Sequence, residues 1–270
     1  MKKRLVFGLV LATFSVTAAH AQVTSSTQHS TSAMAFDAQI ATDDLIAGLI
    51  GVELPGDLGW HPANNDNLDR LPAFTDGSGV RTQTNLTGLL ADVAGAGDPL
   101  GVPVKRVQYN FTASDISEIR ILSGNNLNPD GRVFMTAVIA YSTDNGSNFT
   151  DLGYFQSDLS GTGNDAGNSW RSTLVTIFDN TNPVLLTGVT NLQFNFYPVS
   201  NTALRMQDPF NGTNPFTGVD DGFAPAFESP LIWEIDVIAA DSTAAAPEPA
   251  TLPLLALGGF GVAAWYRRRK

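Results

Sequence analysis

Aromatic side chains in predicted loops are candidates for contact with a carbohydrate ligand. Carbohydrate binding needs aromatic faces against sugar C–H groups and polar side chains that fix the hydroxyls. Four loop residues are candidates for such contacts: Trp60, His61, Trp170 and Phe216. The structural alternative is that Trp60 or Trp170 fills the end of a hydrophobic core. Residues 210–227 are harder to bury entirely, because their aromatic side chains alternate with Asn, Gly, Pro and Asp.

Catalytic arrangements have little support in the sequence. Of the two histidines that follow residue 21, His29 lies in a segment that we expect to be flexible, so a Ser-His-Asp triad would depend on His61 alone. The chain has no cysteine, and we find no nucleophile elbow, His-Glu-x-x-His or glycine-rich phosphate loop. A glycosidase needs only two suitably separated carboxylates. We therefore expect a protein that is not an enzyme, and keep a matrix polysaccharide hydrolase as an alternative.

The first 21 residues are typical of a secretory signal peptide. Basic residues at positions 2–4 precede an apolar run, and Ala19-His20-Ala21 is a small-x-small cleavage site. We expect residues 1–21 to be removed, which leaves a mature chain that begins at Gln22.

The last 24 residues combine three features. Pro247-Glu248-Pro249 cannot extend a helix backwards, because proline lacks an amide hydrogen. Residues 251–266 are uncharged and largely apolar, and Arg267, Arg268 and Arg269 follow them. This pattern predicts a single transmembrane helix with a basic cytoplasmic end. Its length of ~24 Å, at ~1.5 Å per residue, is short against a bilayer core of ~30 Å.

These three features, in this order, resemble the PEP-CTERM sorting signal of Gram-negative bacteria. The resemblance covers residues 247–270. It implies that an exosortase, an integral-membrane transpeptidase-like enzyme, recognises and removes the tail, in organisms that also export polysaccharide. It also implies export through the inner membrane and a final location at the cell surface or in the extracellular matrix.

The body between the two signals is strongly acidic. Residues 22–246 hold 8 basic and 25 acidic residues, a formal charge of −17. Nucleic acid and anionic membrane surfaces are poor partners for such a field, whereas cations are good ones. Because there is no cysteine, the fold of the exported chain depends on its core and not on disulfides.

Alternating apolar residues predict that the body consists of β-strands. Seven stretches show the pattern or are rich in strand-forming residues: 105–111, 116–122, 132–141, 149–155, 172–178, 191–197 and 231–238. Residues 45–50 form an apolar run that is either a short buried strand or a single helix. With turn residues between the stretches and no sustained helical period, the sequence predicts an all-β fold, an antiparallel β-sandwich over residues 37–240.

Two flanking segments and one turn complete this prediction. Residues 22–36 are rich in Ser and Thr and are expected to be a flexible leader, and residues 241–246 a linker to the sorting signal. Asn145-Gly146 supplies the positive φ angles of a tight hairpin turn. The surrounding Ser142-x-Asp144-x-Gly146-x-x-Phe149 resembles an Asp-box, a device that stabilises hairpins.

Short motifs across the body resemble a discoidin-like or galactose-binding-like jelly roll. Phe74-Thr75-Asp76-Gly77 is similar to an early turn of that fold, and residues 229–237 are similar to its last strand. In that family a calcium ion commonly lies between this turn and an acidic residue of the last strand. The resemblance therefore implies a structural Ca²⁺ site at Asp76 and Glu234, with Ser78 as a carbonyl donor. The alternative is that Asp76 shapes its own turn and Glu234 faces solvent.

The sequence thus predicts an exported, non-catalytic β-sandwich. Its expected work is structural or adhesive, in association with exopolysaccharide during biofilm or floc formation. The first alternative is a carbohydrate-binding module with a defined sugar ligand. The expected partners are an exosortase, an extracellular glycan and, before processing, the inner membrane.

Overall fold

The computed structural model describes residues 22–79, 86–91, 101–125, 131–158, 170–200 and 206–241. The predicted signal peptide, most of the linker, the Pro-Glu-Pro motif, the transmembrane helix and the final arginines lie outside the described residues. The elements within them are strands and short 3₁₀ helices, which confirms the all-β prediction. They are β1 (Val23–Ser30), η1 (Asp37–Gln39), β2 (Val52–Glu53), η2 (Asn67–Asp69), η3 (Leu71–Phe74), β3 (Lys105–Gly124), η4 (Gly131–Val133), β4 (Thr136–Ser142), β5 (Thr150–Gln156), β6 (Ser172–Asp179), β7 (Leu186–Phe196) and β8 (Ile232–Ala239).

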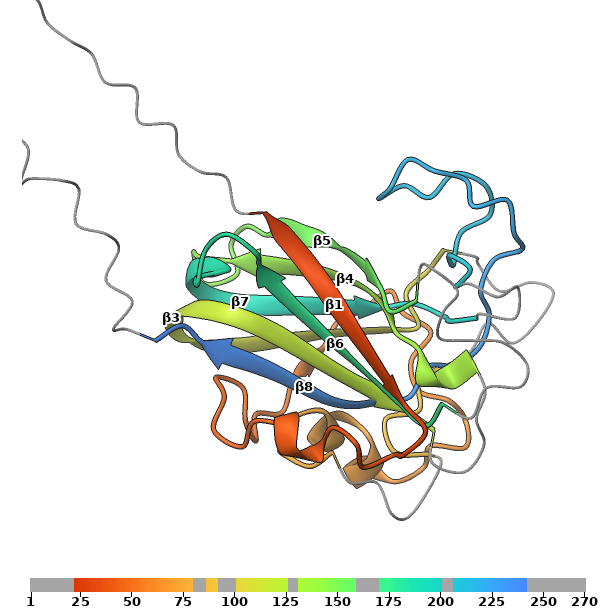
Figure 1. The fold of residues 1–270 in the computed structure, drawn as a ribbon, viewed down its shortest axis with the longest axis horizontal. Helices are drawn as coiled ribbons and strands as arrows, with labels where there is room; N and C mark the ends of the chain where they lie inside the picture. Colours follow the sequence, from red (N-terminus) through yellow and green to blue (C-terminus); the bar gives the residue numbers. More distant parts are fainter. Residues whose placement is uncertain are drawn as a thin grey trace, which may run out of the picture.

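The long strand β3 organises the sheet (Figure 1). Its first half pairs with β2 and β7, and its second half with β6 and β8. Register shifts between Asn110 and Ile116 separate the two halves, and such irregularities bend a strand. Two separately predicted strands, 105–111 and 116–122, are therefore one strand that runs through both layers.

All strand pairs are antiparallel, in the order β1-β6-β3-β7-β4-β5, with β2 and β8 added to β3. The end strands β1 and β5 also contact each other, so the two layers nearly close into a barrel. This arrangement confirms the predicted antiparallel sandwich and corrects one detail of it, because the layers share β3 and are not separate sheets.

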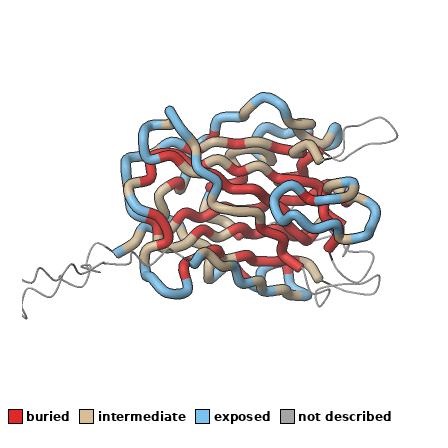
Figure 2. The backbone as a smooth tube through the Cα atoms, turned by 90° about the horizontal axis from the view of Figure 1, so that it is seen from above, coloured by how far each residue is buried: buried red, intermediate tan, exposed pale blue. Residues whose placement is uncertain are grey.

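The core lies between the layers and follows the predicted alternation. In β7, Leu192, Phe194 and Phe196 are completely buried on one face, and Phe194 stacks on Phe196 with ring centroids 6.1 Å apart. Figure 2 shows buried residues along the strands and exposed ones in the surrounding loops. Burying one such side chain contributes roughly 1.5–3 kcal/mol, so the sheet is held without disulfides.

The prediction of a flexible leader over residues 22–36 is wrong. Val23–Ser30 is strand β1, which pairs along its whole length with β6, from Val23 opposite Asp179 to Ser30 opposite Ser172. The polar Ser, Thr and Gln side chains are compatible with an edge strand, because backbone hydrogen bonds hold such a strand and much of its surface is exposed. The folded part of the chain thus starts almost directly after the predicted cleavage site.

The predicted hairpin is confirmed. Asn145 and Gly146 have φ angles of 57° and 80° and connect the paired strands β4 and β5. Asp144 accepts hydrogen bonds from the Ser142 hydroxyl at 2.7 Å and the Asn148 backbone at 2.9 Å. These bonds lower the pKa of the exposed Asp144 to about 2. The Asp-box resemblance is therefore accurate for this turn.

The described residues between 37 and 91 contain little strand, and they cover the outer face of β8. Residues 45–50, which sequence alone left as strand or helix, form a turn with Ile46 completely buried. On β8, Glu234 and Asp236 point to this segment and are 1% and 0% exposed. The solvent-facing alternative for Glu234 is thus wrong, since the outer face of its strand is covered.

Candidate functional site

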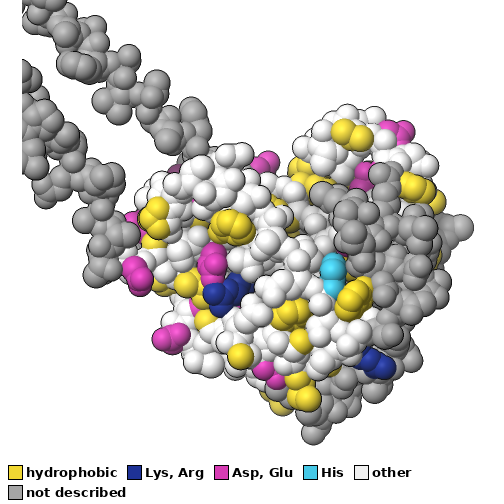
Figure 3. All heavy atoms as spheres, in the orientation of Figure 1, with side chains coloured by type: hydrophobic (Ala, Val, Ile, Leu, Met, Phe, Trp, Pro, Cys, Tyr) yellow, Lys and Arg dark blue, Asp and Glu magenta, His cyan; other side chains and the backbone are white. Residues whose placement is uncertain are grey.

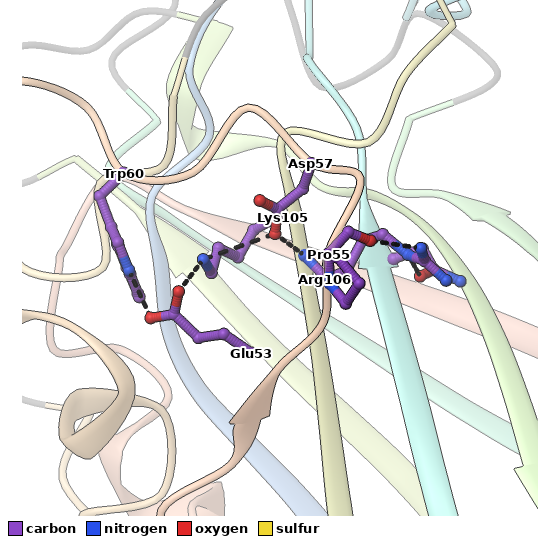
Figure 4. Close-up of polar contacts among 7 residues, drawn as sticks. Glu53, Pro55, Asp57, Trp60, Lys105 and Arg106 are labelled. Carbon is purple, nitrogen blue, oxygen red and sulfur yellow. Dashed lines mark hydrogen bonds and ion pairs between the residues drawn. The ribbon is translucent and has the colours of Figure 1, made fainter.

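Trp60 is held in a polar network at the start of β3 (Figure 4). Its Nε1 donates a hydrogen bond to Glu53 Oε1 over 2.8 Å. Lys105 Nζ lies 2.7 Å from the other Glu53 oxygen and 3.5 Å from Asp57 Oδ2. The Lys105 side chain is only 1% exposed, so its charge depends on these carboxylates.

The adjacent residue of β3 extends this network. Arg106 donates its backbone N–H to Asp57 Oδ2 over 2.7 Å, and its guanidinium donates to the Pro55 carbonyl and to Asn195 Oδ1. Burial raises the pKa of Glu53, but the hydrogen bonds from Lys105 and Trp60 outweigh it and hold the pKa below its ordinary value. The network therefore fastens residues 52–60 to β3.

Protein groups surround the ring of Trp60. Lys105 Nζ lies 5.0 Å from the ring centroid, Arg70 Cζ lies 5.9 Å from it, and the Phe74 ring centroid lies 5.6 Å away. Next to it, His61 Nδ1 accepts a hydrogen bond from the Ala63 backbone over 3.1 Å. These contacts favour the core-filling alternative for Trp60 over stacking on a sugar.

Replacing Trp60 with alanine is therefore expected to affect stability and not ligand binding. The change removes a packed ring, a cation–π contact with Lys105 and a hydrogen bond to Glu53, so the free energy of unfolding should fall by roughly 2–4 kcal/mol. Urea unfolding measures the loss. A full-stability variant with weakened glycan binding would contradict this structural role.

His29 and Trp170 lie together at another place. Their rings stack with centroids 5.7 Å apart, and the Phe134 ring meets His29 edge-on at 5.4 Å. His29 Nδ1 is 3.0 Å from the Thr173 hydroxyl, but Thr173 is completely buried and cannot meet a substrate. Burial lowers the pKa of His29, although Asp158 opposes this. The contact is structural.

The predicted calcium residues lie near each other but are arranged for other bonds. Glu234 accepts hydrogen bonds from the backbone N–H groups of Gly77 and Ser78, both over 3.3 Å. Asp76 Oδ1 accepts from Ser78 N over 2.9 Å, which is the turn-shaping alternative. Both oxygens of Glu234 and one oxygen of Asp76 thus accept backbone N–H groups. In the described chain no group of three or more His, Asp or Glu is placed to hold a metal ion, so a structural Ca²⁺ site at Asp76 and Glu234 stays a prediction.

Two further carboxylates attach residues 37–46 to β8. Asp44 Oδ1 accepts from the backbones of Ile46 and Val237, and Asp236 Oδ2 accepts from Ala41. The second oxygen of each carboxylate is buried without a hydrogen-bond partner. Burial raises the pKa of Asp44, and burial together with the Asp44 charge raises that of Asp236 to about 7.

Residues 206–227, here called the arm, form a projecting loop at one end of the sandwich, drawn in blue in Figure 1. Asp208 N donates to Asp221 Oδ2 over 3.0 Å and Ala226 N donates to the Asp208 carbonyl over 2.8 Å, which closes the base of the arm. Its outer turn is closed by Asn214, whose N–H donates to the Val219 carbonyl over 2.9 Å. The arm is thus an ordered loop.

A pocket of about 240 Å³ lies between the arm and β5. Its described lining is mostly polar: Gln156, Met206, Asp208, Asn214, Thr217, Val219, Asp220 and Asp221. Burial raises the pKa of Asp208, its hydrogen bond to Phe210 N opposes this, and the neighbouring Asp221 charge raises it further. The pocket therefore offers carboxylate and amide groups to a small polar ligand.

Phe216 stands on the arm beside this pocket. Its ring is 42% exposed and stacks almost parallel, at 4°, on Tyr154 of β5 with centroids 5.6 Å apart. Tyr197 and Phe210 contact the same ring at 6.3 and 5.8 Å. One face of Phe216 is thus braced by aromatic neighbours while part of the ring remains accessible.

The four residues predicted to bind sugar therefore fall in two regions. Trp60 and His61 are near the start of β3, whereas Trp170 packs on a cluster that includes Met206, a pocket residue. Of the four, Phe216 is the exposed one, and it lies in the chain between the lining residues Asn214 and Thr217 without lining the pocket itself. The sequence reasoning missed Tyr154 and Asp208, because nothing in a single sequence shows that β5 lies beside the arm.

A comparison with known protein families decides the nature of the C-terminal tail. Residues 245–270 match the PEP-CTERM protein-sorting motif. The PEP-CTERM match includes the Pro-Glu-Pro motif, the apolar stretch and the final arginines, so the sequence prediction is confirmed. The chain is an exosortase substrate that is exported across the inner membrane to a surface location. No curated protein matches the chain.

The PEP-CTERM motif itself falls outside the described residues. Within the described part of the chain, no helix has the length and apolar character needed to cross a membrane. The short transmembrane helix predicted at 251–266 belongs to the matched tail, and its end at the basic cluster fits a C-terminal anchor that precedes processing.

Proposed function

We propose that the exported β-sandwich is a non-catalytic surface or matrix protein with a structural or adhesive role, in contact with exopolysaccharide. The observation that carries the proposal is the PEP-CTERM signal at residues 245–270, which directs the chain to a surface location. The arm supports it, because exposed apolar side chains gather there: Phe216, Val219, Phe223 and Phe227. Figure 3 shows hydrophobic and acidic side chains on this projecting lobe.

The carbohydrate-binding alternative has a specific observation in its favour. An accessible aromatic ring braced by Tyr154 offers a flat face to sugar C–H groups. The adjacent pocket offers the exposed Thr217 and Asp220 and the partly exposed Asp221, whose side chains can bond to hydroxyl groups. Aromatic surface with a few placed polar groups is the usual composition of a small-ligand site. We therefore place the glycan contact at the arm.

Replacing Phe216 with alanine is expected to weaken binding to the producing organism's polysaccharide about tenfold, which corresponds to ~1.4 kcal/mol. The ring is partly exposed, so the free energy of unfolding should change by less than ~1 kcal/mol. Titration calorimetry measures the affinity, and thermal unfolding measures stability.

Leu68→Ala is the matched control, because Leu68 is an exposed apolar side chain outside the arm. Its affinity should equal that of the wild type. A glycan site at the arm would be contradicted if the Phe216→Ala variant bound as tightly as the wild type, or if no polysaccharide showed saturable binding to the wild type.

The hydrolase alternative centres on the same pocket. Asp208 is buried and has a raised pKa, and Asp220 and Asp221 also line the pocket, so a pair of carboxylates is present in principle. Release of reducing ends from the polysaccharide by the wild type, lost in Asp208→Asn, would favour hydrolysis over binding.

A further inference from the structure

We propose that the arm pocket takes an uncharged sugar residue and discriminates against uronic acids. This inference rests on the proposed glycan contact at Phe216 and deepens it by naming the class of ligand. It follows from the size of the pocket, from the chemistry of its lining and from the charge of the surrounding domain.

The size of the pocket suits one sugar ring. Its volume of about 240 Å³ is below the ~300–1,000 Å³ of sites that enclose drug-sized molecules. Phe216, which stacks on Tyr154, lies in the chain between the lining residues Asn214 and Thr217, so one ring of a longer glycan can enter the pocket while a neighbouring unit contacts Phe216.

The lining suits hydroxyl groups. Among the lining residues, Thr217 and Asp220 are exposed and Asp221 is partly exposed, so a ligand in the pocket can reach one hydroxyl and two carboxylates. Asp220 Oδ1 accepts from Gly222 N and Asp221 Oδ1 accepts from Phe223 N, both over 2.9 Å. These bonds hold the two carboxylates at the pocket, and such groups bond readily to the O–H groups of a neutral sugar.

The same lining opposes a negatively charged ligand. Three of the eight described lining residues are aspartates, and none of the eight is basic. Placing a uronate beside these carboxylates brings like charges together where water is partly excluded, which suppresses binding of the wrong ligand. The body's formal charge of −17 adds a repulsion of longer range. The charge pattern therefore selects a neutral glycan over an acidic one.

The test compares two polymers that differ in the charge of one group. The exported protein is titrated with polygalacturonate and with its fully methyl-esterified form, and dextran serves as a second uncharged polymer. Measurements at 0.1 M and 1 M NaCl separate the repulsion by the pocket carboxylates from the repulsion by the charge of the whole domain. The Debye length falls from ~10 Å to ~3 Å between these concentrations, so the long-range repulsion is lost at the higher one. We expect the methyl ester to bind at least tenfold tighter than the acid form at both salt concentrations.

The variant Asp220→Asn removes one pocket charge at an exposed position and should reduce this ratio severalfold. Asp43→Asn removes the same charge from an exposed site outside the pocket lining and should leave the ratio unchanged at 1 M NaCl. Thermal unfolding of both variants checks that the fold is intact.

The two proposals fail in different ways. Equal or tighter binding of the acid form, or a ratio that Asp220→Asn does not change, would overturn the selectivity and leave glycan binding in place. Binding of none of these polymers, together with none of the host polysaccharide, would overturn the glycan contact itself.

Discussion

The Asp236→Asn variant is expected to be more stable than the wild type at pH 7, by up to ~4 kcal/mol, and equally stable or slightly less stable near pH 4. The effect falls between pH 4 and pH 7. It arises from a carboxyl group that is completely buried on the outer face of β8 and that has a pKa raised to about 7.

The surroundings of Asp236 explain the direction of the effect. Burial disfavours its charge most, and the negative charges of Asp44 and Glu118 add to this, while Ala41 N and the Arg120 charge oppose it. Arg120 is opposite Asp236 in the β3–β8 pair but directs its guanidinium to Glu118 and the Gln39 carbonyl. One Asp236 oxygen therefore stays without a donor, and the group favours its protonated form.

The folded chain holds this proton at pH values where the unfolded chain has lost it. Stability therefore falls as the pH rises from about 4 to about 7, at 1.36 kcal/mol for each unit of pKa difference. Asparagine removes the titration, and its amide can still accept from Ala41 N. Urea unfolding of both proteins from pH 4 to pH 8, with Asp43→Asn as an exposed control, measures the difference. A stability difference that does not change with pH would contradict the assigned pKa.

Replacing Gly88 with alanine is expected to destabilise the domain by more than ~3 kcal/mol and to lower the yield of soluble protein. Gly88 has a φ angle of +68°, and an added Cβ would lie 1.7 Å from the Ile232 carbonyl oxygen. Backbone hydrogen bonds from Gly88 N to the Asp69 carbonyl, over 2.7 Å, and from Ile232 N to the Gly88 carbonyl, over 3.1 Å, hold both partners in place. The clash cannot be relieved by a rotamer change, so the contact of this segment with β8 must open.

Gly218→Ala is the matched control for this variant. Gly218 has a similar φ angle of +70°, but nothing lies within 4 Å of its added Cβ. It therefore carries only the conformational cost of a left-handed residue, ~1–2 kcal/mol. Denaturant unfolding compares the two variants, and equal losses of stability would show that backbone conformation, not the approach to Ile232, explains the effect at Gly88.

The sequence predicted those parts of the fold that depend on local pattern. The alternation of Leu192, Phe194 and Phe196 identified β7 and its buried face, and Asn145-Gly146 identified the hairpin between β4 and β5. In both cases the signal lies within a few neighbouring residues, because side-chain period and backbone φ are local properties.

The parts that were missed depend on contacts between distant segments. β1 has polar side chains and exists because β6, about 150 residues later, supplies its backbone partners. Glu234 is buried because the turn at Gly77 covers it. The ring of Trp60 contacts protein and not a ligand, because Lys105 lies over it. For the same reason Phe216 was found from composition, whereas the pocket beside it required the structure.

The most direct test of the account is the fate of the C-terminal tail in a producing cell. We predict that the mature protein at the surface lacks the residues after the Pro247-Glu248-Pro249 motif, as shown by mass spectrometry of its C-terminal peptide. Alanine at these three positions, or loss of the exosortase, should leave the tail attached and the protein in the inner membrane. An intact tail on surface protein, or the same processing with and without the exosortase, would contradict the assigned sorting route.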